Sequence, residues 1–159
     1  MLKELREYFQ RCRHAYNRRK FYELIVREAG VREGDTVLDV GCGESPLSWK
    51  PRNYKIVGLD ILESVLKKAK KKSKGNAEMV RANSQNIPFG SETFDAVICI
   101  DNYSVPQDSL REMIRVVKHG KKVIISESED ELRKIAEKIE DYGFEYRSTK
   151  FGNYISIKK

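Results

Sequence analysis

The amino-acid sequence predicts an α/β fold: a doubly wound, mostly parallel seven-stranded sheet with an antiparallel C-terminal β-hairpin strand and helices on both faces. Short apolar runs such as FDAVICI at Phe94–Ile100 are typical of strands that are buried on both faces. These runs alternate with segments whose apolar residues recur at helical spacing. Near the C-terminus, two strand-like runs are separated only by Phe151, Gly152 and Asn153, a gap that permits a hairpin but no helical crossover.

The first 30 residues are expected to form helices. Apolar residues recur at helical spacing over residues 2–12 and again over residues 21–25, and the second pattern ends at Gly30, a residue that suits a helix C-terminus. With no linker or internal repeat, we expect a single domain over residues 1–159 in which residues 1–30 form an N-terminal helical cap.

The remaining elements follow in order along the chain. The predicted strands are residues 36–40, 54–60, 78–81, 94–100, 122–126, 144–150 and 154–158. Helices are predicted to begin at Asp60, to include 110–117, and to cover 130–142. Pro46 and Pro51 exclude a regular multi-turn helix directly after the first strand.

Composition narrows the class of protein. At 159 residues with 40% hydrophobic content, the chain is expected to fold around one core. The charged fraction of 35% exceeds the roughly 25% of typical domains and indicates a thermophile-like surface. The net charge of +7 is concentrated in residues 1–82, which suggests a face that meets an anionic partner or, equally, a solvated helix surface.

The cysteines and the lengths of the apolar runs indicate where in the cell the protein is located and whether it binds a metal. No run of about 18 apolar residues occurs, and the N-terminus is too charged for a secretory signal. The cysteines Cys12, Cys42 and Cys99 have no metal-ligand spacing. We therefore expect a reduced, cytoplasmic protein without a metal site.

The stretch VLDVGCGES, residues 37–45, is a buried strand followed by a glycine turn. Because ligands of doubly wound sheets lie beyond the carboxyl ends of the strands, Gly41, Gly43 and the later Asp60 are candidate binding residues. A dinucleotide site is poorly supported, since Pro46 stands where the fingerprint needs its third glycine. The simpler alternatives are that the glycines only make a tight strand exit and that Asp60 only caps a helix.

Four motifs in order resemble the class I S-adenosylmethionine-dependent methyltransferases, whose fold is Rossmann-like, from about residue 15 to the end. VLDVGCG matches the family's first motif, and IVGLD, ending in Asp60, matches its second. RANSQNIPFGSETFDAVICI, residues 81–100, resembles the segment from the adenine-contacting loop into the fourth strand. The closing hairpin is also typical of this family.

This resemblance implies S-adenosyl-L-methionine as cofactor, with S-adenosyl-L-homocysteine as product. The glycine turn, including Cys42, would hold the methionyl portion, and Asp39 would orient its amino group. The ribose hydroxyls would bind Asp60, and the adenine would pack on Ile61. The remaining implied cofactor residues are Asn83, Ser84 and Asp101.

The sequence departs from the family at three places. Ser45 replaces a frequent third glycine, Asn83 replaces a frequent aspartate, and the helix after the first motif is reduced to a turn. Asp101 and Tyr103, after the fourth strand, are the candidate catalytic residues. The family's Pro-Pro-aromatic and Pro-Cys motifs are absent there, which argues against methylation of exocyclic base amines and of cytosine C5.

The predicted function is methyl transfer to an unidentified acceptor, which is a small molecule, RNA or protein. The alternative is a non-catalytic S-adenosylmethionine-binding module that supports a partner protein. RNA is a possible partner of the basic N-terminal helix, where Arg and Lys side chains are interleaved with aromatic ones. This cluster consists of Arg11, Arg13, His14, Tyr16, Arg18, Arg19, Lys20 and Tyr22.

Overall fold

The computed structural model describes residues 18–102, 105–139 and 142–159. Its elements are a helix over residues 18–28, β1 (Thr36–Val40), the 3-10 helix η1 (Pro46–Trp49), β2 (Lys55–Asp60), α2 (Glu63–Ser73), β3 (Glu78–Arg81), β4 (Phe94–Ile100), α3 (Gln107–Val116), β5 (Val117–Ser126), α4 (Glu129–Glu137), β6 (Phe144–Thr149) and β7 (Gly152–Lys158). Prediction and structure agree on the bounds of β1, β3 and β4.

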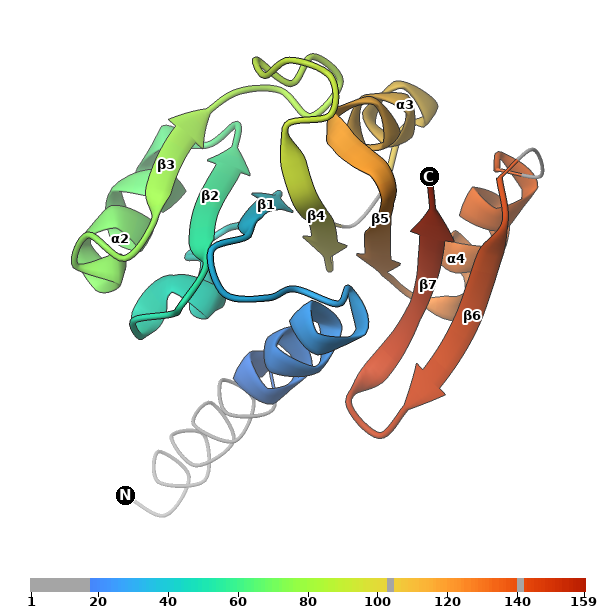
Figure 1. The fold of residues 1–159 in the computed structure, drawn as a ribbon, viewed down its shortest axis with the longest axis horizontal. Helices are drawn as coiled ribbons and strands as arrows, with labels where there is room; N and C mark the ends of the chain where they lie inside the picture. The colour runs from blue at the N-terminus through green and yellow to red at the C-terminus, as the bar shows by residue number, and fades with distance from the viewer. Residues whose placement is uncertain (1–17, 103–104, 140–141) are drawn as a thin grey trace, which may run out of the picture.

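The strands form one sheet in the order β3-β2-β1-β4-β5-β7-β6, with β3 and β6 at its opposite ends (Figure 1). The first five strands pair in parallel. The last two differ, because β7 runs antiparallel to β5 and β6 antiparallel to β7. The predicted fold class is confirmed, including the closing hairpin. Strand order reverses beside β1, the switch point at which α/β sheets bind ligands.

Two apolar clusters cover the two faces of the sheet. One joins side chains of α3 and α4, such as Met113 and Ile135, to inward residues of the strands, such as Leu38. The other joins the helix over residues 18–28 and η1 to the alternate strand residues, such as Val37. Because neighbouring residues of a strand point to opposite faces, Val37 and Leu38 belong to different clusters, and β1 is buried on both sides.

Three predicted boundaries were wrong by three residues or more. The second strand continues through Asp60, so α2 begins at Glu63 instead of Asp60. The strand β5 begins at Val117, where it pairs with Phe94, although Val117 fitted a helical stripe. Helix α4 ends at Glu137, five residues before the predicted end.

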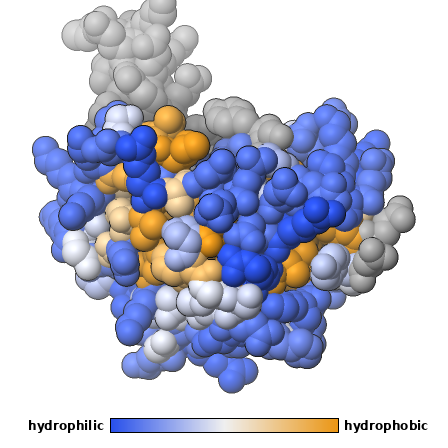
Figure 2. Space-filling view, turned by 90° about the horizontal axis from the view of Figure 1, so that it is seen from above, coloured by the Kyte–Doolittle hydropathy of each residue, from blue (hydrophilic) through white to orange (hydrophobic). Residues whose placement is uncertain are grey.

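Hydrophilic side chains cover most of the face shown in Figure 2, with apolar side chains visible in the hollows between them. This agrees with the charged fraction of 35%. Among the described residues, no helix has the length and apolar character needed to cross a bilayer. The η1 segment confirms that only a short turn of helix follows the glycine turn.

Candidate cofactor site and adjoining cavity

The glycine turn after β1 requires glycine at position 41. Gly41 has a φ of +67°, and its N–H donates to the Leu59 carbonyl at 2.8 Å. A Cβ on Gly41 would lie 2.6 Å from Cγ of Asn102, which follows β4. The turn is therefore packed directly against the end of β4, and no larger residue fits at this position without movement of Asn102.

The carboxylate of Asp60 joins the ends of β1 and β2. Its Oδ2 accepts the N–H of Gly43 at 3.0 Å, and its Oδ1 accepts the N–H of Leu62 at 2.9 Å. Since α2 begins at Glu63 and no side chain caps it, Asp60 is not its N-cap. The side chain instead fixes the glycine turn.

Asp39 is the most unusual residue of the site. It lies on β1 with no exposed surface, and neither carboxylate oxygen has a hydrogen-bond partner among the described residues. Burial, with a smaller contribution from the charge of Asp60, raises its pKa to about 8, although the nearby Arg18 opposes the shift. A buried carboxyl without a donor is costly, so this position is suited to a cationic or hydrogen-bond-donating ligand.

Further polar groups without partners lie in the same part of the fold. The hydroxyl of Tyr22 and that of Ser45 are buried and lack a partner among the described residues. The pKa of Tyr22 is raised well above its ordinary value, first by burial and then by the charge of Asp39. Sequence reasoning had assigned no cofactor role to Tyr22 or Arg18, because no local pattern shows that their helix lies against Asp39.

The basic N-terminal cluster stays a prediction as an RNA-binding surface. Its residues 11–16 lie outside the described residues. The ring of Tyr22, however, is fully buried in the core and is not available for stacking on a base.

The loop after β3 lies beside Asp60, because the N–H of Ala82 donates to the Asp60 carbonyl at 3.1 Å. In this loop Asn83 Oδ1 accepts the N–H of Gln85 at 3.0 Å, and Ser84 Oγ lies 2.8 Å from Oγ of Ser109 on α3. These contacts hold Asn83 and Ser84 in the loop that begins beside Asp60, and their role at the adenine stays a prediction.

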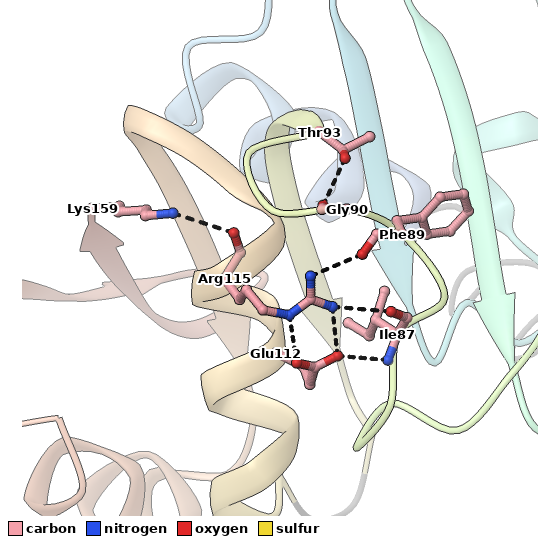
Figure 3. A network of polar contacts seen from close by, with 7 residues as sticks. All are labelled: Ile87, Phe89, Gly90, Thr93, Glu112, Arg115 and Lys159. Carbon is pink, nitrogen blue, oxygen red and sulfur yellow. Dashed lines mark hydrogen bonds and ion pairs between the residues drawn. The ribbon is translucent and has the colours of Figure 1, made fainter.

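A polar network anchors the rest of this loop (Figure 3). The guanidinium of Arg115 on α3 donates to the carbonyls of Ile87 and Phe89 at 3.0 and 2.9 Å. It also binds both oxygens of Glu112, whose Oε2 accepts the N–H of Ile87 at 2.8 Å. The Arg115 hydrogen bond lowers the pKa of Glu112. Arg115 therefore fixes the loop that carries Asn83, though from its far end.

Two apolar side chains next to Asp60 face solvent. Ile61 is 57% exposed and Leu62 is 56% exposed, values that stand out in a protein with a well-packed core.

The side chain of Cys42 points into the protein, although Cys42 belongs to the glycine turn. Its thiol is buried, its pKa is raised chiefly by burial, and it packs so closely on Gly58 that a Cβ there would lie 2.9 Å from Sγ. Only the backbone of Cys42 is placed to meet a ligand.

A cavity of about 430 Å³ adjoins the end of β4. It is lined by Arg18 and Phe21, by Asp101, by residues 126–128 at the end of β5 and directly after it, and by residues 150–153 of the β6–β7 hairpin. Asp101 has a φ of +53°, and its N–H donates to the Ser126 carbonyl at 2.9 Å.

Glu127 also lines this cavity, and sequence reasoning missed it. Its Oε1 accepts the N–H of Asn102 at 2.5 Å, which ties the loop after β5 to the residue that packs on Gly41. The cavity is therefore joined to the glycine turn through Asn102. Tyr103, the second candidate catalytic residue, lies outside the described residues.

Comparison with known proteins identifies the family. Residues 32–156 match a family model described as a methyltransferase domain. Ubiquinone/menaquinone biosynthesis C-methyltransferase UbiE of Escherichia fergusonii is 36% identical over 112 residues, which cover 62% of this chain and 45% of that protein. The Salmonella arizonae protein of the same name is 34% identical over the same shares. The chain thus spans less than half the length of these curated relatives.

Solved structures share the fold. A candidate S-adenosyl-L-methionine-dependent methyltransferase from Methanococcus maripaludis has a TM-score of 0.81 at 18% identity, covering 91% of this chain and 86% of that one. A SAM-dependent methyltransferase from Aquifex aeolicus has a TM-score of 0.67 at 25% identity, covering 85% and 86%. Family and fold imply S-adenosyl-L-methionine as the cofactor. The chain belongs to the methyltransferase-domain family.

Proposed function

We propose that the protein binds S-adenosyl-L-methionine at the ends of β1 and β2 and transfers its methyl group to a small-molecule acceptor. The observation that carries the proposal is Asp39, a fully buried carboxyl without a partner among the described residues. It stands two positions before Gly41, the first residue of the glycine turn, and feels the charge of Asp60.

The chemistry of the methionyl end fits these groups. An α-ammonium group supplies a positive charge and N–H donors for Asp39, which accepts no hydrogen bond from the described residues, and the buried hydroxyls of Tyr22 and Ser45 offer further acceptors. At Gly41 and Gly43 the absence of side chains allows the ligand to approach the backbone closely. Asp39 would therefore gain on binding a partner that the described residues do not give it.

The ribose fits Asp60. Each of its two oxygens accepts one backbone N–H, and a carboxylate oxygen has room for a second donor. Two vicinal hydroxyls can thus bind without displacing Gly43 or Leu62. The same carboxylate would hold the turn and the ribose together.

The adenine fits the two exposed apolar residues after Asp60. Ile61 and Leu62 offer a surface that a planar ring would cover, since both are more than half exposed. Asn83 follows on the neighbouring loop, and its Oδ1, which accepts one N–H, retains a lone pair for the adenine amino group.

The acceptor is proposed to be small because the cavity beside Asp101 is small. Its volume of about 430 Å³ lies within the range of roughly 300–1,000 Å³ typical of small-molecule sites. UbiE is named for a C-methyltransferase step in quinone biosynthesis, which supports an organic small molecule over RNA or protein as acceptor.

The cofactor supplies an electrophilic methyl group on a sulfonium. The chain's part is positioning, because an acceptor in the cavity lies next to Asp101 and, through Asn102, next to the glycine turn. Asp101 and Glu127 are the carboxylates among the described residues that line the cavity, and either can take a proton from an acceptor hydroxyl or activated C–H.

The test is incubation with methyl-labelled S-adenosyl-L-methionine and fractionated cell extract. We expect label in a small-molecule fraction and at least tenfold less with Asp101→Asn, with Asp108→Asn as an exposed control. Label in RNA or protein would contradict the small acceptor. Cofactor binding without transfer to any fraction would favour a non-catalytic binding module.

We also propose a cytoplasmic location. Cys42 and Cys99, the cysteines among the described residues, are both free and buried. This supports a reducing compartment, since disulfides persist mainly in oxidising ones.

A further inference from the structure

The strand β6 leaves one end of the sheet open. Among the described residues its backbone pairs only with β7, and it lies at the margin of the molecule (Figure 1). Every residue from Phe144 to Ser148 is exposed. An unpaired edge of this length is a template for another strand.

Exposed aromatic side chains gather at this edge. Tyr142, Phe144 and Tyr146 are 40%, 42% and 46% exposed, and they account for three of the five large exposed hydrophobic residues in the described part of the chain. A groove of about 250 Å³ lies between β6 and α4, with Leu132 and Ala136 on its far side. An exposed apolar surface of this kind is typical of an interface.

The opposite face of β6 carries charges of both signs. Glu145 and Arg147 point to the same side of the sheet and form an ion pair of 3.0 Å. We propose that β6 pairs antiparallel with β6 of a second copy of this chain, about a twofold axis at Tyr146. Glu145 of each copy then lies opposite Arg147 of the other, and the edge is complementary to itself.

The charges select this register. Because side chains of a strand alternate between faces, the pairing can slip only by two residues if the groove face is to stay on one side. An axis at Glu145 would set two glutamates against each other, and an axis at Arg147 would set two arginines against each other. With the axis at Tyr146, Phe144 lies opposite Ser148 and no like charges meet.

The pairing has a consequence for the proposed acceptor cavity. β6 leads directly into the turn at residues 150–153, which lines that cavity. Fixing β6 in a sheet that continues through both copies would hold this turn in place. The proposed dimer does not depend on the proposed function, because the β6 residues that support the pairing lie outside the proposed cofactor and acceptor sites.

Charge reversal tests the pairing by sedimentation equilibrium of the full chain from about 1 to 100 μM. The wild type should form a dimer in this range. Glu145→Arg and Arg147→Glu should each weaken dimerisation at least tenfold, and the double variant should restore it to within about threefold. Glu63→Lys and Lys67→Glu, an ion pair of 2.9 Å on α2, are the matched controls and should change nothing.

Three results would overturn the proposal. They are a wild type that is monomeric up to 100 μM, single reversals that leave the dimer intact, and a double variant that dimerises no better than the singles. A monomer would leave the edge for a different protein.

A cysteine scan tests the register separately. Opposite residues of an antiparallel pair have Cα atoms about 4.5–5.5 Å apart, a separation that a disulfide can bridge. Tyr146→Cys should therefore cross-link to itself under mild oxidation at least tenfold faster than Phe144→Cys. Faster cross-linking of Phe144→Cys would contradict the axis at Tyr146.

Discussion

The N–H of Gly43 donates to Oδ2 of Asp60 at 3.0 Å, so the turn after β1 is held by the residue that ends β2. The first and second of the motifs at which the chain resembles its family therefore form one structural unit. In the proposed binding mode, Asp60 acts on the cofactor twice, through its own oxygens and through the shape of the turn.

Replacing Asp60 should affect binding more than stability. Asp60→Asn keeps the volume but puts an amide at a site where both oxygens accept N–H groups, so one of those hydrogen bonds becomes a donor–donor contact. We expect at least tenfold weaker binding of S-adenosyl-L-homocysteine by calorimetry. Glu63→Gln, an exposed carboxylate three residues later, is the control and should bind as the wild type does. Unchanged affinity in Asp60→Asn would remove the ribose role.

Asp39 should lower the stability of the ligand-free protein. Its pKa is raised to about 8, whereas in the unfolded chain the carboxyl ionises near pH 4. The folded state therefore keeps a proton that the unfolded state has lost, and stability falls as pH rises from about 4 to about 8. Asp39→Asn removes this loss. We expect it to be more stable than the wild type by about 1–3 kcal/mol at pH 8, with a smaller difference at pH 5.

Urea unfolding at both pH values measures this difference, with the exposed Asp108→Asn as control. If Asp39→Asn is less stable than the wild type at pH 8, a group in the folded protein must stabilise the Asp39 carboxylate, which would contradict this prediction.

Cofactor binding should release a proton below pH 8. The ligand's ammonium group favours the ionised form of Asp39, whose pKa in the free protein is about 8. Affinity should therefore rise up to about tenfold per pH unit from pH 6, and level off near pH 8, where the ligand's own amino group begins to lose its proton. Calorimetry at pH 6.5 in buffers of different ionisation enthalpy counts the protons released. A pH-independent affinity would show that Asp39 does not meet the ammonium group.

A methyl group at Gly41 should disrupt the site. Its φ of +67° disfavours alanine by about 1–2 kcal/mol, and the added Cβ would lie 2.6 Å from Asn102. Gly30 is a matched control, because its φ is +72° but nothing lies within 4 Å of the site of its Cβ. Gly41→Ala should lose at least about 1 kcal/mol more stability than Gly30→Ala. Equal losses would mean that the contact with Asn102 is unimportant.

Arg115 should contribute to the stability of the protein because it anchors the loop after β3. Arg115→Ala leaves the carbonyls of Ile87 and Phe89 without their donor (Figure 3), and we expect a loss of about 1–3 kcal/mol in the free energy of unfolding. Arg111, on the same helix but exposed and paired with Asp108 at 3.5 Å, is the control, and its replacement by alanine should cost less than about 0.5 kcal/mol. Similar losses in both variants would contradict the anchoring role.

Sequence patterns predicted the features that are local. The run FDAVICI identified β4 at its true bounds, and the two prolines after Ser45 predicted the short η1. The spacing of Gly41, Gly43 and Asp60 predicted that these residues meet, because parallel strands bring their carboxyl ends to one edge of the sheet.

Features that depend on tertiary packing were missed. No pattern placed Tyr22 and Arg18 against Asp39, because the packing of their helix against β1 is a tertiary contact that no local pattern encodes. Nothing in the sequence distinguishes Glu127 from other loop residues, because its contact with Asn102 appears only in the structure. Val117 fitted a helical stripe, but its pairing with Phe94 placed it in β5.

The central claim is that the groups around Asp39, Gly43 and Asp60 form a cofactor site. Titration of the wild-type protein with S-adenosyl-L-homocysteine in a calorimeter tests it most directly. We expect one site per chain with a dissociation constant in the micromolar range or tighter, which corresponds to a binding free energy of about −8 kcal/mol. Absence of binding at 1 mM ligand would contradict it.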